Sequence, residues 1–92
     1  MRDQNFGIEI EMTGLSRKKA AEVIAAHLGT RASYYGGSYN EYHVKDQSGR
    51  TWKLMSDASI RTTRSGESVE MVSPICKYED IPIIQEIVRQ LR

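Results

Sequence analysis

The stretch NFGIEIEM, residues 5–12, decides how the fold is built, because polar and apolar side chains alternate along it. Ile8 and Ile10 lie on one side of the alternation, and Glu9 and Glu11 lie on the other. A period of two is typical of a β-strand with one buried face. The stretch therefore predicts a strand whose two carboxylates point away from the core.

The rest of the chain predicts two helices and three further strands. Ser16 is a suitable N-cap for a first helix that ends at Gly29, and Asp80 for a second helix with Pro82 in its first turn. Residues 33–40 are rich in Gly, Ser and Tyr and predict a mobile loop. The further strands are expected at residues 42–45, 52–55 and 69–72, where polar and apolar side chains again alternate.

Two amphipathic helices must bury their apolar stripes, and the strands offer the large apolar surface for this. The predicted fold class is therefore α+β, in the order β-α-β-β-β-α. A mostly antiparallel four-stranded sheet would carry both helices on one face.

Length and composition predict one domain, residues 1–92, in a reducing and cytoplasmic compartment. The 13 basic and 12 acidic side chains nearly balance, which argues against a general binder of polyanions. The single cysteine, Cys76, excludes a disulfide framework. No apolar run approaches the roughly 20 residues of a membrane-spanning helix, so no membrane partner is expected.

Strand alternation also predicts which side chains occupy the face that the helices leave uncovered. They are Glu9, Glu11, His43, Lys45, Lys53 and Glu70, joined by Asp57 if the third strand runs that far. Parity alone favours an ordinary solvated face, since antiparallel sheets commonly have one. The apolar surroundings of the three glutamates favour a site instead, because carboxylates in such strands are costly unless paired or bound to metal. Magnesium is the cation that such oxygen ligands suit.

Three motifs resemble the opening motifs of the amidoligase family: FGIEIEMTG at residues 6–14, WKLMSDASI at 52–60 and VEMVSP at 69–74. Their order matches too, and the resemblance covers nearly the whole chain. That family is placed with glutamine synthetase and glutamate–cysteine ligase, which join a carboxylate to an amine at the expense of ATP. The resemblance implies part of a glutamine synthetase-like fold and an ATP- and Mg²⁺-dependent amide-bond-forming ligase, or its nucleotide- and metal-binding N-terminal portion.

The resemblance also implies roles for individual residues. Glu9 and Glu11 would hold magnesium at the ATP phosphates, with Glu70 as a further metal ligand. The cofactor-binding residues expected are Glu9, Glu11, Lys53 and Arg64, and the catalytic residues expected are Asp57, Ser59 and Arg61. Asp57 and Ser59 would lie near the substrate or its amine, whereas the two arginines would meet phosphate or a substrate carboxylate.

Family members are longer than this chain, so an excised N-terminal part and a minimal relative that self-associates both stay open. Either way, we expect little catalysis by the chain alone. The substrates expected are a small-molecule or peptide carboxylate and an amine.

Two other function classes share features with this sequence. From Ser16 onward the expected order α-β-β-β-α is also that of a double-stranded RNA-binding domain, but the charge balance and the acidic start of the last helix argue against nucleic acid as a partner. A non-catalytic module of the same fold is the other alternative, and the three glutamates speak against it.

Two features on or near the uncovered face left choices open. For His43, a solvated strand histidine is favoured over a metal ligand, because no second His or Cys stands at ligand spacing. Tyr34, Tyr35 and Tyr39 belong either to a variable loop or to a segment that closes over a base or substrate.

Overall fold

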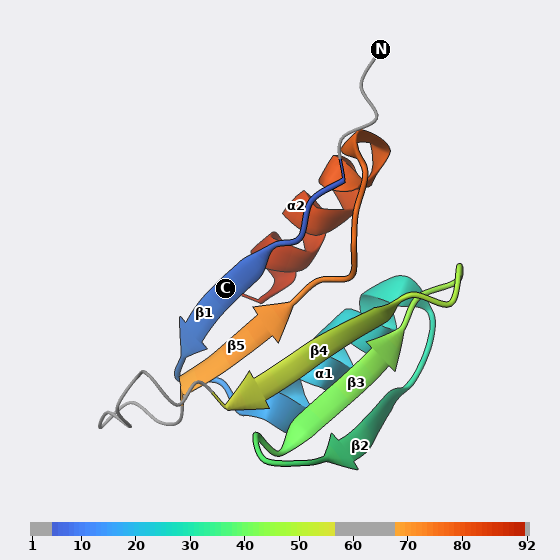
Figure 1. Ribbon diagram of the computed structural model, residues 1–92. Coiled ribbons are helices and arrows are strands. Elements are labelled where there is room, and N and C mark those ends of the chain that lie inside the picture. The colour runs from blue at the N-terminus through green and yellow to red at the C-terminus, as the bar shows by residue number, and fades with distance from the viewer. Residues whose placement is uncertain (1–4, 57–67, 92) are drawn as a thin grey trace.

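The computed structural model describes residues 5–56 and 68–91, and within them five strands form one antiparallel sheet (Figure 1). The elements are β1 (Glu9–Thr13), α1 (Arg17–Leu28), β2 (Ala32–Gly36), β3 (Glu41–Lys45), β4 (Thr51–Ser56), β5 (Ser68–Val72), the short 3₁₀ helix η1 (Tyr78–Asp80) and α2 (Ile81–Gln90). The strands lie side by side in the order β1-β5-β4-β3-β2. The α+β class is confirmed.

The first strand has the predicted orientation. Ile8 and Ile10 are half-buried, whereas Glu9 and Glu11 are exposed. β1 pairs with β5, and an isolated bridge between Phe6 and Cys76 continues this pairing toward the N-terminus. The alternation of residues 5–12 therefore positions the glutamates as expected.

Helix α1 begins and ends where its capping residues predict. The Ser16 hydroxyl accepts a hydrogen bond from the Lys19 backbone N–H at 3.0 Å, which satisfies one of the free donors of the first turn. Gly29 ends the helix at a φ of 72°, a left-handed conformation that glycine adopts without steric cost. The helix packs its small side chains, with Ile24, against β3 and β4.

Both helices lie on the same side of the sheet, behind the strands in Figure 1. Side chains of α1 and α2 share one core with those of β3, β4 and β5. The most buried members include Ala21, Ile24, Val44, Trp52, Leu54, Val69, Met71, Cys76 and Ile87, all fully shielded from solvent. Trp52 is the largest fully buried side chain of this core, and Cys76 is one of its smaller members.

The prediction of a loop over residues 33–40 is wrong for its first half. Ala32–Gly36 forms β2, an edge strand paired with β3, and only the turn that follows is irregular. The Gly and Ser content of this segment indicates a loop, whereas its two adjacent tyrosines, Tyr34 and Tyr35, are residues that favour strands. The sheet therefore has five strands rather than four. Because four strands follow α1, the α-β-β-β-α order behind the RNA-binding alternative is also wrong.

The turn between β3 and β4 is organised by the buried carboxylate of Asp46. Its Oδ1 accepts hydrogen bonds from the backbone N–H groups of Ser48 at 3.0 Å and Arg50 at 2.9 Å. Its Oδ2 accepts from Trp52 Nε1 at 3.1 Å and from Arg50 Nε at 2.9 Å. The aspartate thus fixes the turn and also satisfies the indole N–H that the core buries.

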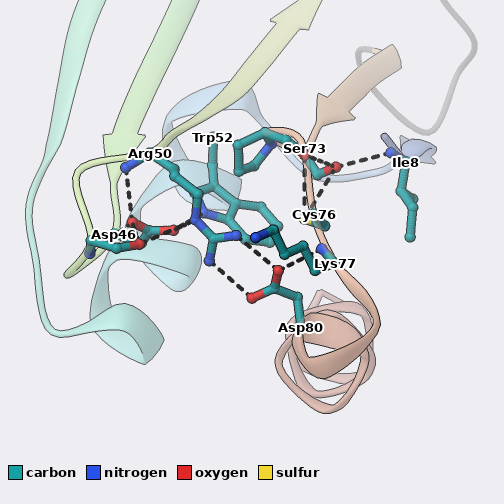
Figure 2. Close-up of polar contacts among 10 residues, drawn as sticks. Ile8, Asp46, Arg50, Trp52, Ser73, Cys76, Lys77 and Asp80 are labelled. Atoms are coloured by element: carbon teal, nitrogen blue, oxygen red, sulfur yellow. Dashed lines mark hydrogen bonds and ion pairs between the residues drawn. The ribbon is translucent and has the colours of Figure 1, made fainter. Parts of the chain in front are cut away.

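Asp80 stands at the N-cap position of α2, but its side chain does not cap that helix. Its two oxygens instead accept a bidentate pair from Arg50, at 2.9 and 3.0 Å, and one of them also accepts from the Lys77 backbone N–H at 2.7 Å (Figure 2). The prediction of a capping Asp80 is therefore corrected, because a guanidinium fork is a stronger partner than a helix N–H. The ion pair joins the β3–β4 turn to the start of α2.

Candidate functional site

The face of the sheet opposite the helices carries the side chains that parity predicted. Glu9 and Glu11 on β1 are exposed, and Glu70 on β5 and Lys53 on β4 are half-buried. In Figure 1 this open face of the sheet is turned toward the viewer. We refer to it below as the open face.

Glu11 and Glu70 lie directly opposite each other in the β1–β5 pair. The backbone N–H of Ser73 donates to the Ile8 carbonyl at 2.9 Å, so Ile8 and Ser73 form a hydrogen-bonded pair. Such pairs alternate with non-hydrogen-bonded ones along an antiparallel ladder, which makes Glu11 and Glu70 a non-hydrogen-bonded pair with Cα atoms about 4.5 Å apart. Like charges in this position are unfavourable unless a cation lies nearby.

A cation of the protein lies in the neighbouring row. Glu9 is opposite Val72, Val72 is opposite Lys53, and Lys53 is opposite His43. Adjacent strands are about 4.8 Å apart, so Lys53 lies roughly 10 Å along the row from Glu9. The open face thus carries three glutamates on β1 and β5 and a lysine on β4, whereas β3 contributes both Glu41 and Lys45.

His43 differs from the solvated strand histidine that the sequence favoured. Its Nε2 contacts Glu41 Oε1 at 2.7 Å, and its ring stacks on that of Tyr35, with centroids 4.3 Å apart and planes 14° apart. Only 17% of the His43 side chain is exposed. The cluster escaped sequence reasoning because Tyr35 was assigned to a loop, and a second strand is what brings its ring over His43.

Four of the expected site residues, Asp57, Ser59, Arg61 and Arg64, lie outside the described residues. The segment that contains them follows Ser56, the last residue of β4. Arg17 Nη1 donates to Ser56 Oγ at 2.7 Å, so a half-buried guanidinium ties the end of β4 to the first turn of α1. This contact joins residues 39 positions apart and has no local signal in the sequence.

The open face has donor atoms that suit magnesium, although it does not form a closed cage. Among residues 5–56 and 68–91, no three His, Cys, Asp or Glu side chains converge as a metal cluster. Magnesium needs no such cluster, since it is usually bound through one or two carboxylates together with water and substrate phosphates. Glu11 and Glu70, opposite each other, fit that pattern, and Glu9 lies two residues from Glu11 on the same face.

A groove of about 520 Å³ lies elsewhere, beneath β1 and between the two helices. Apolar side chains, such as Ile10, Val23, Val88 and Leu91, make up most of its lining. Its polar lining residues are Glu11, Lys19 and Gln90, so Glu11 borders both this groove and the open face. The candidate site is assigned to the open face because all three glutamates share that face.

The comparison with protein families decides the assignment. The family described as "Putative amidoligase enzyme" matches residues 2–92. The chain belongs to this amidoligase family. No curated protein and no solved structure matches the chain significantly.

Membership of the amidoligase family indicates a ligase-like function. The motif around Glu9 and Glu11 forms β1, and the motif around Glu70 forms the adjacent β5. None of the helices that the structure describes in this amidoligase is long and apolar enough to cross a membrane.

Proposed function

We propose that this amidoligase is an ATP- and Mg²⁺-dependent ligase that forms an amide bond between a carboxylate and an amine, and that its sheet is part of a glutamine synthetase-like fold. One observation carries the proposal. Glu9, Glu11 and Glu70 share the uncovered face of one sheet, in a chain of the amidoligase family, with two of them opposite each other.

The proposed chemistry has two steps. A carboxylate oxygen of the first substrate attacks the γ-phosphorus of ATP, which forms an acyl phosphate as the bond to ADP breaks. The amine nitrogen of the second substrate then attacks the acyl carbon, so that a C–N bond forms, inorganic phosphate leaves and the nitrogen loses a proton. Both steps gather negative charge on phosphate oxygens, and nearby fixed cations stabilise that charge.

The residues of the open face divide these tasks. The three glutamates would hold magnesium, which when bound neutralises charge on the phosphates. Lys53, on β4, would meet phosphate oxygens directly. Asp57, Ser59 and Arg61 stay the catalytic candidates and Arg64 stays a cofactor-binding candidate, and all four follow β4 in the sequence.

Titration of the isotope-labelled chain with Mg²⁺–ATP, followed by backbone amide shifts, tests the proposal. We expect saturable shifts at Glu9, Glu11 and Glu70 that require magnesium. Glu9→Gln and Glu11→Gln keep nearly the same shape but lose the charge, and we expect each to weaken binding by at least about tenfold, equivalent to about 1.4 kcal/mol.

The matched control is Glu22→Gln, which removes a carboxylate from the exposed side of α1. It should leave binding unchanged. If Glu9→Gln and Glu11→Gln bound Mg²⁺–ATP as the unmodified chain does, the assignment of the site would be wrong. The mass of the chain in solution, recorded in the same titration, tests self-association, which we propose as one route to a complete site.

A further inference from the structure

Tyr35 presents an aromatic surface on the open face, held in place from beneath. One side of its ring stacks on His43, and His43 is held in turn by Glu41 at 2.7 Å. The supporting side chains are 17% and 16% exposed, whereas Tyr35 is 66% exposed. The outer side of the tyrosine ring therefore faces solvent while its orientation is constrained.

Strand alternation from Ser33, which pairs with His43, places Tyr35 on the open face, and the backbone of β2 departs from regular geometry at this residue. The register between β2 and β3 shifts between Tyr34 and Gly36, which makes Tyr35 the extra residue of a β-bulge. Gly36 has a φ of 89°, a conformation that a residue with a side chain rarely adopts. Bulges re-aim single side chains and are common beside active sites.

The neighbouring Tyr34 shows that this arrangement is specific to one ring. Tyr34 is similarly exposed, at 60%, but points to the other side of the sheet. It contacts the edge of Tyr42, with ring centroids 5.1 Å apart, and Tyr42 packs against the core. Of these two adjacent tyrosines, only Tyr35 shares a face with the three glutamates.

The spacing across the face matches a nucleoside triphosphate. From β5, which carries Glu70, to β2, which carries Tyr35, there are three strand intervals, or about 14 Å. This is comparable to the length of an extended nucleoside triphosphate. Lys53, on β4, lies between the two ends, where the phosphate chain would run.

We propose that Tyr35 is the stacking platform for the base of the nucleotide whose magnesium-bound phosphates lie at Glu9, Glu11 and Glu70. The proposal rests on the proposed function, because it extends the same site to its other end. Stacking on an aromatic ring tolerates every base. The platform therefore adds affinity for a nucleotide without selecting adenine over guanine.

The test compares two ligands that differ only in whether a nucleoside is present: Mg²⁺–ATP and Mg²⁺–tripolyphosphate. Tyr35→Leu should weaken Mg²⁺–ATP binding about tenfold, the effect expected from the loss of one stacked base. It should leave Mg²⁺–tripolyphosphate binding unchanged. Tyr35→Phe keeps the ring and should bind both ligands as the unmodified chain does.

Tyr34→Leu is the matched control, because it removes an equally exposed ring from the same strand but from the opposite side. It should bind both ligands normally. In the unmodified chain, contacts between the protons of the adenine and those of the Tyr35 ring, detected as nuclear Overhauser effects, test the same point without any substitution.

The outcomes separate the two proposals. If the unmodified chain binds neither ligand, the proposed function fails and the base platform fails with it. If it binds both, and Tyr35→Leu binds Mg²⁺–ATP normally or weakens both ligands equally, the platform is wrong while the phosphate site stands.

Discussion

Two regions of the molecule contain several carboxylates, and the regions differ in whether those carboxylates are buried and paired or exposed to solvent. At the β3–β4 turn, Asp46 and Asp80 are each about 8% exposed, and Arg50 bridges them. On the open face, Glu9 and Glu11 are exposed and make no ion pair or hydrogen bond within the part of the chain that the structure describes. The carboxylates of the first region are therefore paired within the protein, whereas those of Glu9 and Glu11 are exposed to solvent.

The difference separates acids that stabilise the fold from acids available to a ligand. A buried carboxylate that lost its partner would bear the full cost of desolvation, so Asp46 and Asp80 can be kept only as a satisfied network. An exposed glutamate bears no such cost and is free to bind an external cation. Substitutions at Asp46, Arg50 or Asp80 should therefore mainly lower stability, whereas substitutions of the glutamates on the open face should mainly weaken ligand binding.

The largest expected effect is the loss of stability in Arg50→Ala. The substitution leaves two buried carboxylates without their shared cation, and breaking such a pair costs about 3 kcal/mol of unfolding free energy. Urea denaturation at pH 7 measures it. The control is Arg89→Ala, whose side chain is 79% exposed and pairs only with Glu86 among described residues, and which should change stability by less than about 0.5 kcal/mol. A similar small change in both variants would contradict a stabilising role for the network.

The next effect is a loss of stability in acid. Burial raises the pKa of Asp46, but hydrogen bonds from Trp52, Arg50 and Ser48 outweigh it and lower the pKa to about 2. The pKa of Asp80 is also lowered, chiefly by the hydrogen bond from Arg50. A carboxyl with a depressed folded pKa contributes stability that is present above its unfolded pKa and is lost as pH falls through the folded value.

We therefore expect the unfolding free energy to fall steeply between about pH 4 and pH 2, as followed by urea denaturation across that range. Asp80→Asn removes one of the two carboxyls, so it should start from a lower stability at pH 7 and lose less of it on acidification. An acid profile parallel to that of the unmodified chain would show that Asp80 does not carry this dependence.

The same comparison explains which parts could be predicted from the sequence. Glu9 and Glu11 could be placed on the open face because strand parity is a local property of residues 5–12. The pairing of Glu11 with Glu70 could not, since it depends on β5 lying between β1 and β4. The motifs could suggest that these residues share a site, but not which two face each other.

The polar network was only half predictable for a similar reason. The contacts of Asp46 with Ser48 and Arg50 are local, because they lie within five consecutive residues. The bond from Arg50 to Asp80 joins positions 30 residues apart and has no local signal, so Asp80 was interpreted as a helix cap. Strand β2 has no clear local signal, because Gly36, which follows the bulged Tyr35, and the next residue, Gly37, are typical of a loop.

The smallest expected effect has the opposite sign and is the sharpest test of the comparison. Glu11 faces Glu70 across a non-hydrogen-bonded pair, where like charges destabilise a sheet. Glu11→Gln removes one of these charges with little change in shape and should raise the unfolding free energy by about 0.5 kcal/mol at low salt. The gain should shrink in high salt, which screens exposed charges.

Magnesium should stabilise the unmodified chain more than this variant, because binding to the folded state alone raises stability by mass action. A variant that was less stable than the unmodified chain would place Glu11 among the acids that hold the fold together, and its role as a metal ligand would lose its physical basis.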